Sequence, residues 1–160
     1  MFAHILLAVL ITASAPPPLQ DWKTFHPFIG TWSGTRTTAR GTVSVTRSFE
    51  SVGDNQHLLV SDRVASVESP WGLVSVDPVR DVFVLRRFRP DGGMDELVLS
   101  DVSNDGTTLV FDRALDNGAS SVERITIERH GWSEFVERVE QRDHGAPFTV
   151  VSETQFRRKR

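Results

Sequence analysis

Three charged side chains, Arg47, Asp62 and Arg86, each share an alternating face with apolar residues in an extended stretch of the chain. A charge on a buried face is costly unless it is paired or in contact with water. Residues of these types in this pattern therefore predict either ion pairing or recognition of a charged ligand. The three faces consist of Val43, Val45, Arg47 and Phe49; of Leu58, Val60, Asp62 and Val64; and of Val82, Val84, Arg86 and Phe88.

Two interpretations of these charged positions remain open. In the first, the strand ends twist outward and the charges lie near a rim. In the second, they line a cavity in which Arg47, Arg86 and a further arginine, Arg124, face Asp62 or an anionic ligand. The five candidate ligand-binding residues are Arg47, Asp62, Arg86, Arg124 and Glu137.

Glu137 belongs to the stretch "FVERVEQRD", which offers three glutamates for acid–base chemistry. In a strand, Glu134 and Glu140 share one face and Glu137 lies on the other. Ion pairs across strands on an outer face explain these carboxylates better than paired catalytic groups do. An inward Glu137, together with Asp62, would be the pair to suspect in an enzyme. The sequence shows no nucleophile beside a base, so no catalytic residue is assigned. An enzyme is therefore a less favoured class of function than a binding protein.

The sequence lacks the motifs that would indicate a metal site, a serine nucleophile, a phosphate-binding loop or a nucleic-acid interface. No two histidines stand at i, i+2 or i, i+4, and the chain has no cysteine, so no metal site is predicted. There is no Gly-x-Ser-x-Gly motif, and the glycines fall in separate reversals rather than in a phosphate-binding loop. A net charge of −3 with a pI near 5.9 argues against a nucleic-acid partner.

The elements that position these residues are short strands. From Gly30 onward the pattern alternates with period two, and reversals such as "VGDN", "PDGG", "NDGT" and "DHGA" carry turn residues. Short turns join antiparallel neighbours, and closure removes two unpaired edges. We expect an all-β fold, a single antiparallel up-and-down β-barrel of about ten strands over residues 30–160. Its strands are expected around GTWSGTRT, VSVTRSF, HLLVSDRV, WGLVSV, DVFVLRRF, DELVLSDV, TTLVFDRAL, VERITIE, WSEFVERVE and FTVVSETQF.

The first 29 residues have a different character. Residues 1–15 combine an apolar run with the small-x-small pattern "ASA" and predict a secretory signal peptide, hence export to the periplasm or medium with no membrane span after processing. An uncleaved N-terminal anchor is the alternative, although the run is shorter than a bilayer-spanning helix needs. Residues 16–29 are expected to form a linker and a short helical turn ended by Pro27.

A short helical turn, then Gly30-x-Trp32 on the first strand, then Arg158 near the end of the last strand resembles the calycin superfamily, which includes lipocalins and fatty-acid-binding proteins. The resemblance implies that the Trp closes one end of the barrel while the Arg lies across its ring, with Arg157 the alternative arginine. With "GTWSG", "DPVRD" and "PDGG", the chain from Leu19 onward is most similar to a bacterial lipocalin-like group of unknown function related to nitrobindins.

This resemblance implies binding of a small apolar or amphipathic ligand in the barrel. Nitrobindins bind haem through a histidine on a late strand, but His130 and His144 fall in reversals here, and only His57 lies in or beside a strand. Haem is therefore a minority alternative, and no cofactor is predicted. Two other classes stay open: a calycin-like isomerase or cyclase, and a solid barrel of the cell envelope that acts through its loops.

Overall fold

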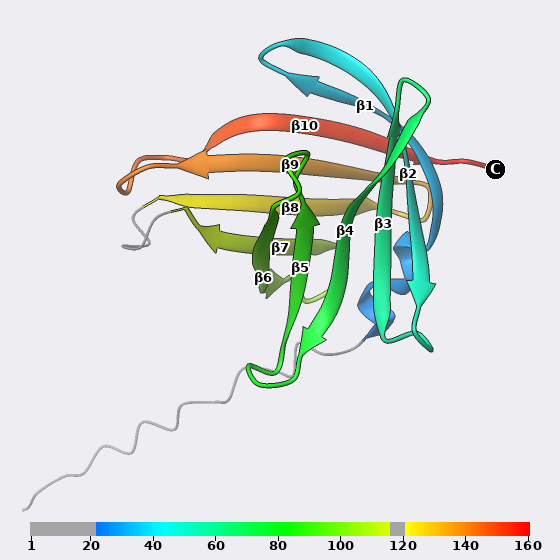
Figure 1. Cartoon of the computed structure of the whole chain (residues 1–160), viewed down its shortest axis with the longest axis horizontal. Helices are drawn as coiled ribbons and strands as arrows, with labels where there is room; N and C mark the ends of the chain where they lie inside the picture. Colours follow the sequence, from blue (N-terminus) through cyan, green and yellow to red (C-terminus); the bar gives the residue numbers. More distant parts are fainter. Residues whose placement is uncertain (1–21, 116–120) are drawn as a thin grey trace, which may run out of the picture.

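The chain folds into a closed barrel of ten antiparallel strands, in which each strand pairs with its neighbours in sequence and β1 pairs with β10 (Figure 1). The computed structural model describes residues 22–115 and 121–160. The strands are β1 Gly30–Thr38, β2 Gly41–Val52, β3 His57–Val64, β4 Val67–Asp77, β5 Val82–Phe88, β6 Met94–Val102, β7 Thr108–Ala114, β8 Val122–His130, β9 Glu134–Arg142 and β10 Thr149–Arg158. The expected fold class is confirmed.

Parts of the sequence-based expectation lie outside the described residues. These are the signal peptide over residues 1–15, the first part of the linker, and the reversal at residues 116–119. The described end of the linker forms two short 3₁₀ turns, η1 Trp22–Thr24 and η2 His26–Phe28. Within the described ranges, no helix is both long and apolar enough to cross a membrane.

One half of the barrel interior is a packed apolar core. The two 3₁₀ turns lie at the end where β2 finishes and β3 begins (Figure 1). Phe25, between the two turns, and Phe28, in the second, are buried among other aromatic rings. The ring centroids of Phe28 and Phe135 are 5.5 Å apart, and those of Phe25 and Phe83 are 4.9 Å apart, both edge-to-face. Only about 20 Å³ stays empty among these side chains. This half therefore has no room for a ligand.

Trp32 and Arg158 complete this closed end. Trp32 is fully buried, and its indole N–H donates a hydrogen bond of 2.7 Å to the carbonyl of Phe28. Arg158 pairs with Trp32 in the β1–β10 ladder, and its guanidinium carbon lies 4.3 Å from the Trp32 ring centroid. The same guanidinium donates to the carbonyl oxygens of Pro27, Ile29 and Trp132. Arg158 thus fixes the N-terminal turns to the end of β10.

Gly30 allows this close approach. Its φ is +122°, and a Cβ at this position would stand 2.9 Å from Nη1 of Arg158. Any other residue would therefore meet both a strained backbone and the arginine.

On β5 the interpretation that turns Arg86 into the cavity is wrong. Phe83 and Leu85 enter the core and Arg87 follows them inward, so Val82, Val84 and Arg86 face outward. Both Phe83 and Val84 are fully buried, which means that the strand is apolar on both faces at this point. An alternating pattern cannot show which side is the interior when neighbouring residues are equally buried.

Strand β4 is longer than expected because it begins directly after a two-residue turn. Ala65 and Ser66 both adopt positive φ, at 49° and 70°, although neither is a residue that favours that region. Val64 pairs with Val67 across this turn. Because the turn contains no glycine or asparagine, turn chemistry does not predict it, and the strand predicted from the sequence begins only at Trp71.

Replacing Trp32 tests the closed end. We expect Trp32→Ala to lower the free energy of unfolding by about 3–5 kcal/mol, as for other buried large aromatic residues. Trp132→Ala is the matched control, because that side chain is 72% exposed and its loss should change stability by about 0.5 kcal/mol or less. Urea unfolding of both variants measures the difference. Equal midpoints for the two variants would show that Trp32 does not hold the barrel end together.

Candidate functional site

The end of the barrel opposite the 3₁₀ turns is open and polar. Two adjoining cavities lie there, with volumes of about 520 and 680 Å³, and Arg36, Trp71 and Arg87 line both of them. Each is large enough for a small organic ligand. We call this pair of cavities the mouth. The charged residues that line it are Arg36, Arg40, Asp62, Arg87, Arg89, Asp95, Arg113, Glu123 and Glu137.

Arg47 lies at the boundary between the packed core and the mouth. It is fully buried, and it is held by two buried carboxylates from other strands. Its Nε donates to Asp62 on β3 over 2.6 Å, its Nη2 donates to the second Asp62 oxygen over 3.0 Å, and its Nη1 donates to Glu137 on β9. A bidentate pair of this kind is the strongest ionic contact available to an arginine. The structure therefore brings three of the five sequence candidates together.

Aromatic rings surround the same guanidinium. Its carbon lies 4.1 Å from the ring centroid of Trp71 and 4.9 Å from that of Phe156. Cation–π contacts strengthen when the cation is removed from water, as it is here. Arg36 supplies a second cation to this group and donates to Asp62 over 2.6 Å.

These contacts determine the direction in which the pKa values of Arg47 and Asp62 shift. Burial by itself would lower the pKa of Arg47, but Glu137 and Asp62 outweigh that effect and raise the pKa above its ordinary value. Burial would raise the pKa of Asp62, yet the hydrogen bonds from Arg47 and Arg36 hold it below its ordinary value. Asp62 therefore stays ionised at neutral pH, but its lowered pKa makes it a weak base, and both of its oxygens already accept hydrogen bonds from arginines.

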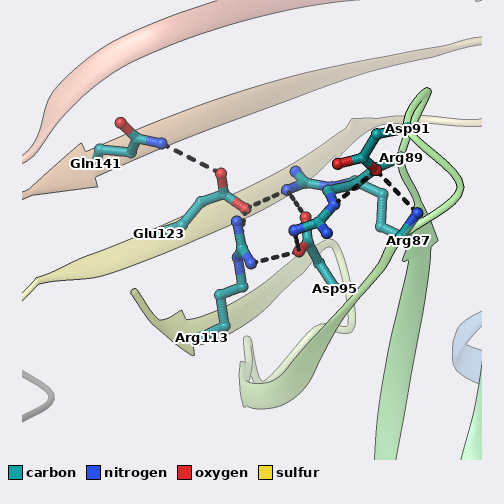
Figure 2. Close-up of polar contacts among 8 residues, drawn as sticks. Arg87, Arg89, Asp91, Asp95, Arg113, Glu123 and Gln141 are labelled. Atoms are coloured by element: carbon teal, nitrogen blue, oxygen red, sulfur yellow. Dashed lines mark hydrogen bonds and ion pairs between the residues drawn. The ribbon is translucent and has the colours of Figure 1, made fainter. Parts of the chain in front are cut away.

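A second ionic cluster forms the opposite wall of the mouth. Figure 2 shows Arg87, Arg89 and Arg113 gathered round the carboxylates of Asp95 and Glu123. Nη2 of Arg87 lies 2.8 Å from Asp95 and 2.7 Å from Glu123, and Arg113 lies 2.6 Å from Asp95 and 3.1 Å from Glu123. Burial opposes the ionisation of Asp95, but the hydrogen bond from Arg87 and the charge of Arg113 keep its pKa below the ordinary value. Four strands, β5 to β8, thus share one network.

Two β-bulges turn apolar side chains toward the mouth. In the β3–β4 ladder Val60 pairs with Gly72 while Ser61 pairs with Pro70, which leaves Trp71 as the extra residue. In the β9–β10 ladder the register shifts between Val150 and Ser152, and the extra residue is Val151. Both extra residues line the mouth. A bulge re-aims a side chain that regular pairing would place elsewhere, and bulges are frequent beside binding sites.

The remaining two candidates, Arg86 and Arg124, lie on the outer face of the barrel, so the interpretation that places them in the cavity is wrong. Arg86 reaches Ser75 Oγ over 2.6 Å and Glu96 over 3.2 Å on the outer face of β4 to β6. Arg124 pairs with Asp112 over 2.8 Å on the outer face of β7 and β8, and it lies 4.4 Å from the Phe148 ring centroid. On each strand the adjacent residue, Arg87 or Glu123, points inward instead.

Sequence reasoning missed Arg36 and the whole second cluster. The second cluster could have been found by the pattern that singled out Arg47, in which an ionic residue stands on the same alternating face as two or more apolar residues. This pattern recurs in Asp95–Leu97–Leu99, in Leu109–Phe111–Arg113 and in Glu123–Ile125–Ile127. In each case the apolar pair is buried in the core and the ionic residue lines the mouth.

Histidines take no part in the described mouth. The lining of the two cavities contains none, and His57 faces away from the interior because its neighbour Leu58 enters the core. His144 adopts a positive φ of 46° in the reversal between β9 and β10. Over residues 22–115 and 121–160, no three His, Asp or Glu side chains are grouped so that they could hold a metal ion.

No protein-family model and no curated protein matches the chain. The solved structure of Rv2717c from M. tuberculosis matches with a TM-score of 0.56 at 17% identity, covering 92% of this chain and 100% of that one. The ten-stranded barrel fits a calycin-like fold. The S-type phycobiliprotein lyase CPES from Guillardia theta matches with a TM-score of 0.54 at 10% identity, covering 86% of this chain and 92% of that one.

Removing Arg47 tests the boundary between core and mouth. We expect Arg47→Met to lower the free energy of unfolding by about 3–5 kcal/mol, because it leaves the buried Glu137 carboxylate without its partner. Adding Glu137→Gln to this variant removes the uncompensated charge and should recover part of the loss. Urea unfolding measures all three proteins.

Arg124→Met is the control for this experiment. Its ion pair is partly exposed and should contribute about 1 kcal/mol or less. The interpretation of Arg47 fails if the two single variants lose equal stability, or if the double variant is less stable than Arg47→Met alone.

Acid provides a separate test of Asp62. Its pKa in the folded protein lies below the unfolded value of about 3.9, so its contribution to stability is complete above pH about 4 and is lost as the pH falls through the folded pKa. Asp62→Asn should be less stable than the native protein at pH 7, and the two melting temperatures should converge toward pH 2. Melting curves that stay parallel over this range would contradict the assignment.

Proposed function

We propose that this protein binds a small amphipathic molecule in the mouth of its barrel. One observation carries the proposal: the barrel is packed and closed at one end, whereas the other end holds adjoining cavities of about 520 and 680 Å³. Ligand sites are typically concave and apolar with a few polar groups that fix orientation. Trp71 and Val139 supply apolar surface here, and Arg36 and Arg87 supply the polar groups.

An amphipathic ligand fits this site better than a purely apolar one. The apolar half of the interior has only about 20 Å³ free, so an apolar molecule would have to occupy the charged half. There it would bury arginines and carboxylates without offering them hydrogen bonds, at a cost in free energy. A ligand with one polar end avoids this cost.

Other functions have less support. A catalytic role for Asp62 and Glu137 is disfavoured because Arg47 binds both carboxylates. A solid barrel acting only through its loops is disfavoured by the volume of the mouth. Haem binding through His57 is disfavoured by the outward position of that residue. Export after removal of residues 1–15, and a relation to nitrobindins, are parts of the proposal that rest on the sequence.

Native mass spectrometry of the protein purified from cells that produce it naturally tests the proposal. We expect a reproducible small molecule that is released on denaturation and is lost in Trp71→Ala. Trp132→Ala is the matched control and should retain it, because Trp132 is an exposed residue at the closed end. The polypeptide mass from the same spectra shows whether residues 1–15 have been removed. A protein that is reproducibly empty, or a ligand that both variants retain, would contradict binding in the mouth.

A further inference from the structure

The two arginines shared by both cavities have unused hydrogen-bond donors. Arg36 uses Nη2 on Asp62 and Nε on Thr154, the latter over 3.4 Å. Arg87 uses Nη2 on both Asp95 and Glu123. Among the described residues, Nη1 of Arg36 and both Nε and Nη1 of Arg87 have no partner. A guanidinium that carboxylates hold from one side, with free N–H groups on another, is preorganised for a further acceptor.

The charge of the mouth favours a negative acceptor. Five arginines and four carboxylates line the two cavities, and the fully buried Arg47 lies directly behind them. The mouth therefore carries an excess of positive charge, although the whole chain has a net charge of −3. An excess of one sign in a cleft attracts ligands of the opposite sign.

Apolar contacts lie beside these donors. Trp71 lines both cavities together with Arg36 and Arg87, and Val151 lines the smaller cavity together with the same three residues. Both side chains reach this position through a bulge, and Val151 remains 44% exposed. An apolar skeleton placed against them would cover this surface while its charged end meets the arginines.

We propose that the ligand is an organic anion, with a carboxylate or phosphate group held by Arg36 and Arg87 and an apolar skeleton packed against Trp71 and Val151. This inference rests on the proposed function, since it defines the class of ligand that the mouth accepts. Arginine binds both carboxylate and phosphate through its planar set of donors, so the two head groups share one chemistry.

Isothermal titration calorimetry with three matched probes tests this proposal. The probes are 2-naphthoate, 2-naphthyl phosphate and the neutral 2-naphthamide, which have the same apolar skeleton. We expect at least one anion to bind about tenfold or more tightly than the amide, and the preference to shrink as sodium chloride is added. The tighter of the two anions identifies the head group.

Variants of residues on β5 test whether Arg87 produces the preference for an anion. Arg87→Met should remove most of the preference for an anion, and Arg87→Lys should keep part of it. Asp95 and Glu123 still pair with Arg113 in these variants, so the fold has support without Arg87. Arg86→Met is the matched control, because it removes the same charge one residue away on the outer face. It should leave the preference unchanged, and melting curves verify that each variant is folded.

The outcomes separate the two proposals. Equal affinity for the anions and the amide, lost in Trp71→Ala, would overturn the anionic class while supporting ligand binding in the mouth. A preference that survives both Arg87→Met and Arg36→Met would overturn the assignment of these arginines. Absence of binding by all three probes would count against the anion site and, together with an empty protein in native mass spectrometry, against the proposed function.

Discussion

The rest of the structure depends on one buried contact, the pairing of Arg47 with Asp62 and Glu137. A guanidinium with no exposed surface is tolerated only because two carboxylates and two aromatic rings replace its water. The contact joins β2, β3 and β9, and it lies where the aromatic core gives way to the charged half. It therefore divides the interior into two regions. Apolar side chains fill one region, and in the other the charged groups are paired with one another or in contact with water.

This division explains how a barrel of this size can be stable and still open. Packing of Phe and Leu side chains, together with the Trp32–Arg158 contact, holds one end. The mouth contributes ion pairs that are partly exposed, and such pairs add little stability. Its residues consequently have more freedom to serve a ligand. The bulges at Trp71 and Val151 interrupt the strand ladders in this half of the barrel. An irregular pair at these positions does not disturb the packing of the apolar core.

Much of the fold was predictable from the sequence because turn residues and alternation are local signals. Arg47, Asp62 and Glu137 all lie inside the barrel in the structure, but the sequence left their orientation open because each shares its alternating face with apolar residues. Arg86 was misplaced because β5 is apolar on both faces around Val84, and the Ala65–Ser66 turn was missed because it lacks the usual residues. The bulge at Trp71 was beyond sequence reasoning, since an extra residue is defined only by its partner strand.

Barrel closure has a consequence for the order of folding. Nine of the ten ladders join strands that are adjacent in sequence and can form early as hairpins, whereas the β1–β10 ladder joins residues as distant as Trp32 and Arg158. Closing so long a loop carries the largest entropic cost, so we expect this ladder to form last and to limit the rate. The same ladder brings Arg158 onto Trp32. An intermediate that has not closed thus exposes two strand edges and an uncovered tryptophan, which makes it the species most prone to aggregate.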